Sequence, residues 1–305
     1  MIQTSNRASS SLGLQEIVGE VMEEFRKIIS DEQPQALVMS TGFERLDDYL
    51  DGLKPGLHML AGRAQMGKTT LMLTITDHIC FEQKVPSLIF SMEQSAPDLL
   101  RRIIFPKACL DPFYHERKPV LVSKKELIRL KETADKIAAS RLFIEENGSF
   151  WIDDLVNTAK RHKQENHIGF IAIDHLQLLR SNTTITPRVA EFVDIVSKLK
   201  RLSLELNVPI LLVSGLMRKP PQSKKIFFGL PLAHHIKFYQ SINGYMNSVM
   251  TLYRPRYYAE SEEEREAVYR QAKLTICKSR NIEFAQISLD FDEINMRISS
   301  STNEQ

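Results

Sequence analysis

The stretch GRAQMGKTT, residues 62–70, constrains the fold more than any other part of this sequence. It fits the pattern G-x-x-x-x-G-K-[ST], whose backbone N–H groups and following helix N-terminus hold the phosphates of a nucleotide. An apolar run at 57–60 precedes the loop, and a helical pattern at 70–80 follows it. This order of strand, loop and helix is the one that such a loop requires, so the sequence predicts a P-loop nucleotide site.

The residues of the loop have different predicted roles. Lys68 would reach the β- and γ-phosphate oxygens, and the hydroxyl of Thr69 would ligate Mg²⁺. The rest of the loop would surround the phosphates with its backbone. The nucleotide contacts predicted from the loop are Gly62, Arg63, Ala64, Gln65, Met66, Gly67, Lys68, Thr69 and Thr70.

Two acids are candidates for the chemistry at this loop. A P-loop enzyme needs a carboxylate at the end of a buried strand to hold the metal, and a base for the attacking water. Asp174 ends the apolar run IGFIAID and is the predicted metal acid; an ordinary turn or helix-capping aspartate is the alternative. Glu93 follows the apolar run SLIFS and is the predicted base, with a plain surface glutamate as the alternative.

The pattern of apolar residues predicts the fold class. Short, wholly apolar runs alternate with helical patterns between residues 57 and 214, which is typical of a parallel sheet covered by helices on both faces. A capping box at 123–126 and helical patterns at 151–165 and 188–206 fit this reading. The runs after residue 248 read as strands with few helices between them. The prediction is an α/β fold of mostly parallel strands, extended by antiparallel C-terminal strands.

Residues 1–35 differ from the rest of the chain. Residues 1–11 are rich in serine and predicted to be disordered, and 12–35 form an amphipathic helix and a polar linker. The helix could pack on its own domain or dock on a neighbouring subunit, and the sequence leaves both open. The predicted nucleotide-binding domain covers 36–299, followed by a disordered tail at 300–305.

Composition limits which classes of protein this chain can belong to. Forty Lys and Arg against 38 Asp and Glu give a net charge of +2, so any nucleic-acid surface has to be local. The three cysteines lie far apart without zinc-ligand spacing, which indicates reduced thiols. The N-terminus is polar and no apolar run approaches about 18 residues, so export and membrane insertion are unsupported and we expect a cytoplasmic protein.

Beyond the P-loop, several motifs occur in a specific order. TGFERLD, GRAQMGKTT, SLIFSMEQ, IAIDHLQLL, ELNVPILLVS and ICKSRN follow one another along the chain. In this order they resemble the motor domain of the DnaB-type hexameric replicative helicases, over about residues 40–298. The resemblance implies a RecA-like fold, ATP hydrolysis with Mg²⁺, a ring that is hexameric in the family, single-stranded DNA as the substrate, and a loader or replication protein as a partner.

Position by position, the resemblance assigns roles. It gives Lys68 and Thr69 to phosphate and Mg²⁺, Asp174 to the metal, and Glu93 to the activation of water. It implies that Lys278 and Arg280 reach into the ATP site of a neighbouring subunit as a finger in trans. Without the resemblance, KSR at 278–280 reads as an exposed strand end.

The sequence also departs from the family pattern. The helical N-terminal domain that usually precedes the linker helix is not found in this sequence. Ser214, Gly215 and Leu216 stand where the family has S-Q-L, whose glutamine senses the γ-phosphate. The stretch 235–247 stands where the family has a charged DNA-binding segment and has lost nearly all those charges.

A substitute DNA surface is predicted at residues 217–229. Positive charge follows a phosphate backbone, and aromatic faces stack on bases without reading their sequence. A solvated loop with its two phenylalanines tucked underneath is an equal alternative. The residues of this candidate surface are Arg218, Lys219, Lys224, Lys225, Phe227 and Phe228.

The function predicted from the sequence is an ATP-dependent helicase or translocase that acts as a ring on single-stranded DNA. The alternative from another class is an ATP-responsive ring-forming assembly or adaptor protein that does not unwind DNA. Gly215 and the stretch 235–247 favour that alternative, whereas Glu93, Asp174 and Arg280 favour the motor. A recombinase-like ATPase shares the core, but DHLQLL and KSRN disfavour it.

Overall fold

The computed structural model describes residues 18, 19, 22, 38–110, 123–183, 187–216, 236–279 and 284–301. The chain divides into two units, Met1–Val38 and Met39–Gln305. In the first unit, Val18, Gly19 and Met22 are helical, and the other residues of the predicted segments 1–11 and 12–35 lie outside the described part. The predicted boundary at 35–36 stays a prediction. All that follows concerns the second unit.

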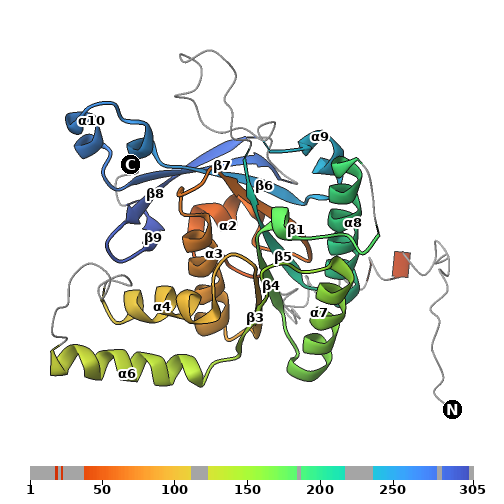
Figure 1. The fold of residues 1–305 in the computed structure, drawn as a ribbon, viewed down its shortest axis with the longest axis horizontal. Coiled ribbons are helices and arrows are strands. Elements are labelled where there is room, and N and C mark those ends of the chain that lie inside the picture. The colour runs from red at the N-terminus through yellow and green to blue at the C-terminus, as the bar shows by residue number, and fades with distance from the viewer. Residues whose placement is uncertain are drawn as a thin grey trace. The chain divides into compact units, whose positions relative to one another are not determined.

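One sheet organises the second unit (Figure 1). Within the described residues it has nine strands in the order β3-β2-β4-β5-β1-β6-β7-β8-β9. The strands from β3 to β6 pair in parallel, and those from β6 to β9 pair antiparallel. The strands are β1 (Gly56–Gly62), β2 (Ser87–Ser91), β3 (Leu142–Glu146), β4 (Phe170–Asp174), β5 (Pro209–Gly215), β6 (Ser248–Tyr253), β7 (Gln271–Lys278), β8 (Ala285–Asp292) and β9 (Arg297–Ser300). The predicted fold class is confirmed.

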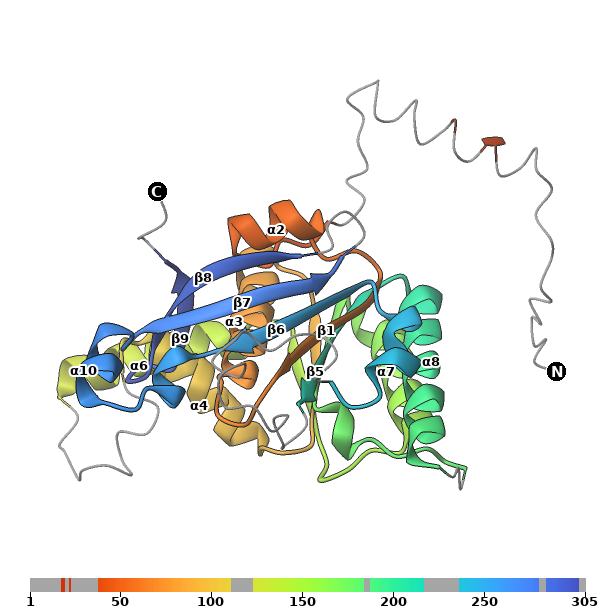
Figure 2. The same cartoon turned by 90° about the horizontal axis from the view of Figure 1, so that it is seen from above.

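Helices cover both faces of the parallel part. Figure 2 shows α3 and α4 on one side of the sheet and α7 and α8 on the other. Two separate apolar clusters correspond to these two layers. The helices are α2 (Glu44–Leu50), α3 (Lys68–Asp77), α4 (Ala96–Lys107), α6 (Lys124–Ala138), α7 (Ile152–Asn166), α8 (Arg188–Leu206), α9 (Tyr239–Ile242) and α10 (Glu262–Ala267).

Burial explains why the strands have different sequences. Every residue of β1 is buried, because helices cover both faces of the sheet. Successive side chains of β1 point into opposite apolar clusters. Met59 packs in the cluster with α7 and α8, and Leu60 packs in the cluster with α3 and α4. In β8, by contrast, buried residues alternate with half-buried ones, as in a sheet covered on one face. Continuous and alternating apolar patterns therefore mark the parallel and antiparallel parts.

Local signals set the helix ends. The predicted capping box at α6 is present: Glu126 N–H donates to Ser123 Oγ at 3.3 Å, and Ser123 N–H donates to Glu126 Oε2 at 2.8 Å. The helix predicted at 70–80 is α3, which begins at Lys68 and continues after Asp77 as a π-helical turn, His78–Glu82. Among the described residues, no helix combines the length and apolar character needed to cross a bilayer.

His58 is a polar residue inside the sheet. It lies on β1 with 4% of its surface exposed. Its Nε2 is 2.8 Å from the carbonyl oxygen of Lys54, and its Nδ1 is 2.8 Å from Ser248 Oγ. Because a carbonyl only accepts, Nε2 carries the proton and Nδ1 accepts from the serine hydroxyl. Burial lowers the pKa of His58 to about 4 and keeps the ring neutral.

This burial makes stability depend on pH. Between pH 6.5 and about pH 4, the unfolded chain protonates His58 while the folded chain does not, so stability falls as pH falls, by roughly 3 kcal/mol in all. We expect His58→Gln to flatten the pH dependence of the urea midpoint between pH 7 and pH 5. The control His167→Asn, at the exposed end of α7, should keep the wild-type slope. An unchanged slope in His58→Gln would contradict this assignment.

Candidate nucleotide-binding site

The phosphate loop connects β1 to α3 in an unusual backbone conformation. Gln65 and Gly67 both have positive φ, at 64° and 90°. Gly67 is the N-cap of α3, and its carbonyl accepts the Leu71 N–H at 2.9 Å, which closes the first helical turn. The N–H groups at the start of a helix have no intrahelical partners and favour an anion. The loop thus has the geometry of a phosphate cradle.

Residues of the C-terminal strands pack against this loop. A Cβ on Gly67 would lie 2.5 Å from Phe291 Cε2, so the ring fills the space beside the glycine. Arg254, 6% exposed at the end of β6, donates to the Gln65 carbonyl at 3.3 Å. The Arg254 guanidinium carbon lies 3.9 Å from the centroid of the Phe291 ring. This brace of the loop was not predicted from the sequence.

An acid holds the bracing arginine in place. Glu293 forms ion pairs with Arg254 and with Arg256, the latter at 2.6 Å. Burial lowers the pKa of Arg254 to about 10, so it stays charged at neutral pH. The one signal in the sequence is an arginine that directly follows a buried strand.

The predicted metal pair is close together. Asp174 ends β4 with 1% of its surface exposed, and its Oδ2 accepts a hydrogen bond from Thr69 Oγ1 at 2.7 Å. Burial raises the pKa of Asp174, and the bond from Thr69 partly opposes this rise. The two residues therefore join the end of β4 to the start of α3.

Glu93 lies beside this pair. It follows β2, and 59% of its side chain is exposed. His175, which was not among the predicted site residues, connects the acids: its Nδ1 is 3.3 Å from Glu93 Oε2 and 3.9 Å from Asp174 Oδ1. One ligand atom from each of these three residues lies within 4.8 Å of the others. Oxygen and imidazole ligands at this spacing suit a divalent cation.

The other loop residues have distinct surroundings. Lys68 Nζ donates to the carbonyl of Arg63 at 2.8 Å, and burial lowers its pKa although Asp174 and Glu93 act in the opposite direction. Ala64 and Gln65 are exposed. Met66 is buried. Thr70 is also buried, and it lines a cavity on the side of α3 toward α4.

Gln177 connects the ends of β4 and β5. Its Oε1 accepts the Gly215 N–H at 3.0 Å, and its Nε2 donates to Ser214 Oγ at 3.0 Å and to the Gly215 carbonyl at 3.2 Å. A Cβ on Gly215 would lie 3.8 Å from Gln177, an ordinary contact. Sterics therefore do not require glycine at this position.

Among the remaining predicted site residues, Lys278 is described, and it lies away from this cluster. Lys278, at the end of β7, donates to the carbonyl of Asn243 at 2.6 Å, and burial lowers its pKa. The predicted finger residue and the whole predicted DNA surface lie outside the described residues: Arg280, Arg218, Lys219, Lys224, Lys225, Phe227 and Phe228.

Sequence comparison identifies relatives of this chain. The family model "DnaB-like helicase C terminal domain" matches residues 38–300. A "Probable replicative DNA helicase" of Trieres chinensis is 30% identical over 263 residues, 85% of this chain and 56% of that relative. "Replicative DNA helicase DnaB" of Haemophilus influenzae is 28% identical over 298 residues, 94% of this chain and 61% of that relative. The chain spans about half the length of the curated relatives that it matches.

Solved structures share the fold. One of them, described as an ATPase domain, superposes with a TM-score of 0.81 at 20% identity, covering 96% of this chain and all of that one. A DnaB-like replicative helicase, described with its interactions with primase, gives a TM-score of 0.77 at 20% identity, covering 96% and 68% of the two chains. At this identity the likeness concerns the fold.

The contact between the loop and Phe291 can be tested at Gly67. Gly67→Ala adds a Cβ at a φ of 90° against the ring, so we expect a loss of about 1–3 kcal/mol of stability. Phe291→Leu alone is destabilising because it truncates a buried ring. In that background Gly67→Ala should cost less than in the wild type, because only the backbone strain remains. Gly148→Ala, where nothing lies within 4 Å, is the matched control. Denaturant unfolding measures all these variants, and equal midpoints for Gly67→Ala and Gly148→Ala would contradict the contact.

Proposed function

The chain belongs to the DnaB-like helicase C-terminal domain family, and from this we infer that it is an ATP-hydrolysing motor that moves along single-stranded DNA. The observation that carries the proposal is the hydrogen bond from Thr69 to Asp174, with Glu93 alongside. It joins a phosphate loop to an acid at the end of a neighbouring buried strand. This is the arrangement that phosphoryl transfer needs.

The residues of the site fit ATP and Mg²⁺. The loop backbone and Lys68 would bind the phosphates, and Thr69 and Asp174 would hold the cation. Both offer oxygen atoms, the ligands that Mg²⁺ prefers. When bound, Mg²⁺ would neutralise negative charge on the phosphate oxygens. Lys68 is available for the same task, since its ammonium group bonds to a loop carbonyl that a phosphate can replace.

Glu93 is the proposed general base. A carboxylate that is largely exposed can reach a water molecule and accept its proton. His175 Nδ1, 3.3 Å away, orients the carboxylate. Asp174 is buried and bonded to Thr69, so it is less able to act as the base. The two acids thus have separate proposed roles.

Assembly and DNA binding extend the proposal. We propose a ring, a hexamer by analogy with the family, in which Arg280 and Lys278 complete the site of a neighbouring subunit. The proposed DNA contacts are in 217–229, while the apolar residues of 236–247 have another role: Ile242 and Met246 are buried against the sheet. A loader or replication protein as a partner, and a cytoplasmic location, stay predictions.

The proposed roles of the site residues predict distinct defects. Lys68→Ala should lose ATP binding. Glu93→Gln should bind ATP yet hydrolyse it about 100-fold more slowly or worse, because only water activation is removed. Glu132→Gln, on the exposed face of α6, should behave as wild type. Phosphate release, measured with and without single-stranded DNA, and binding of a fluorescent ATP analogue separate these effects.

The same proteins test the whole function. The wild-type chain should hydrolyse ATP faster when single-stranded DNA is added and should displace a strand from a forked duplex. Wild-type hydrolysis by Glu93→Gln would mean that the base is another residue. An ATPase that ignores DNA and displaces no strand would contradict the motor.

Mixing two inactive variants tests the finger in trans. Arg280→Ala keeps an intact loop, and Lys68→Ala keeps an intact finger. A mixed ring therefore contains some complete sites, and its activity should exceed the sum of the two separate proteins. Native mass spectrometry shows whether mixed rings form. If they form and activity does not return, Arg280 does not act across the interface.

A further inference from the structure

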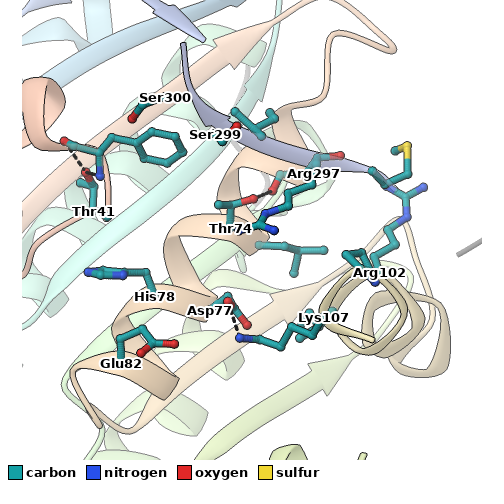
Figure 3. Close-up of a pocket in the computed structure, with 18 of the residues that line it drawn as sticks. Thr41, Thr74, Asp77, His78, Glu82, Arg102, Lys107, Arg297, Ser299 and Ser300 are labelled. Atoms are coloured by element: carbon teal, nitrogen blue, oxygen red, sulfur yellow. Dashed lines mark hydrogen bonds and ion pairs between the residues drawn. The ribbon is translucent and has the colours of Figure 1, made fainter. Parts of the chain in front are cut away.

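A cavity lies on the other side of the phosphate-loop helix. It has a volume of about 450 Å³ and is enclosed by α3, α4, β9 and residues 41–43 (Figure 3). Small-molecule sites span roughly 300–1,000 Å³, so a compact organic ligand fits. Lys68, Thr69, Glu93 and Asp174 do not line it. The cavity is therefore separate from the nucleotide site described above.

Two buried polar atoms in its wall lack hydrogen-bond partners. The hydroxyl of Thr70 belongs to a residue that is 3% exposed, and Oγ1 has no partner. Asp77, two turns further along α3, pairs through Oδ2 with Lys107 at 2.9 Å, while its buried Oδ1 is unpartnered. Both residues line the cavity. Buried polar groups in native proteins are nearly always satisfied, so these two atoms have unused hydrogen-bonding capacity beside the cavity.

The charged side chains in the cavity wall limit which ligands can bind there. Arg102, Lys107 and Arg297 line the cavity, against the carboxylates of Asp77 and Glu82. In Figure 3, Arg297 reaches toward Thr74 on α3, Arg102 extends away from it on the α4 side, and Asp77 and Lys107 lie further along α3 and α4. Guanidinium groups bind phosphate or carboxylate groups well. Arg297, which lies on the same side as α3, therefore suits an anion, and Asp77 suits a hydrogen-bond donor.

Part of the remaining wall is apolar. It offers flat and aliphatic surfaces to the body of a ligand, which is typical of sites for heterocycles. These surfaces come from both helices, from β9 and from the segment that precedes α2. The apolar lining residues are Phe43, Leu73, Ile103, Pro106, Met296 and Ile298.

We propose that this cavity is a second ligand site, for a small molecule that joins an anionic group to a hydrogen-bond donor on a flat apolar body, the chemistry of a nucleoside monophosphate. The anion binds at Arg297, the donor bonds to Asp77 Oδ1, and Thr70 Oγ1 bonds to the polar middle of the ligand. A monophosphate lacks the β- and γ-phosphates that the phosphate loop surrounds, so it distinguishes this site from the first.

Calorimetric titration with AMP tests the proposal. AMP should bind the wild type and Lys68→Ala with equal affinity, since Lys68 is not in the wall. Arg297→Gln should weaken AMP binding about tenfold or more, because a hydrogen bond to a charged group is lost. Arg265→Gln, an exposed arginine on α10, is the matched control and should not change it. Thr70→Val, which keeps the shape of the side chain, should fold normally and bind AMP more weakly.

A chemical readout locates the ligand without reference to activity. Cys109 is exposed and lines the cavity, whereas Cys80 is buried and Cys277 half-buried elsewhere. AMP should slow alkylation of Cys109, followed by mass spectrometry, and leave Cys277 unchanged in the same sample.

Several results would overturn the proposal. Loss of AMP binding in Lys68→Ala would place the ligand in the phosphate loop. Adenosine or inorganic phosphate binding as tightly as AMP would show that only one half of the ligand is recognised. Protection of Cys109 that rises with protein concentration without AMP would mean that a second copy of the chain fills the cavity. Absence of both AMP binding and protection would refute the site outright.

Discussion

The contact between Gly67 and Phe291 links the two halves of the fold. The phosphate loop directly follows β1 in the parallel part of the sheet, and Phe291 lies on β8 in the antiparallel part. A side chain at residue 67 has no room, and its backbone has a positive φ that glycine adopts without strain. Arg254 adds a hydrogen bond to the Gln65 carbonyl from the end of β6. The loop is thus held by residues far along the sequence: Arg254 follows Gln65 by 189 residues, and Phe291 follows Gly67 by 224.

Burial of the parallel strands accounts for the rest of the site. Because β1, β4 and β5 have helices on both faces, their central residues are apolar apart from the hydrogen-bonded His58, and their other polar side chains come where the strands end. Asp174 comes at the end of β4, and Ser214 and Gly215 at the end of β5. The hydrogen bonds from Thr69 Oγ1 to Asp174 and from the Gly215 N–H to Gln177 Oε1 then fix these ends to one another. The candidate site lies at one edge of the sheet because the apolar core occupies the strands behind it.

The sequence predicted those parts that local patterns determine. Helix α8 has the predicted bounds because its apolar period continues without interruption, and Asp174 could be placed because it ends an apolar run. The brace was not predictable, because Arg254 and Phe291 meet Gly67 only through the pairing of β6, β7 and β8. His175 was missed for a similar reason: its role depends on the distance to Glu93, on a different strand end. The cavity beside α3 depends on packing between three elements, which no local pattern encodes.

Helix α3 borders the phosphate loop at its first turn and the cavity along another face, so binding at one place can affect binding at the other. Its first turn carries Lys68 and Thr69 toward the acids, and its other face carries Thr70 and Asp77 toward the cavity. The helix lies in a densely packed core, with Leu71, Met72 and Ile75 all buried, so it moves as a unit or not at all. Arg102, in the cavity wall, is also within electrostatic reach of Asp174 and Glu93, and burial lowers its pKa. A ligand that shifted α3 or neutralised Arg102 would change phosphate affinity at the loop, and nucleotide at the loop would change the affinity of the cavity by the same factor.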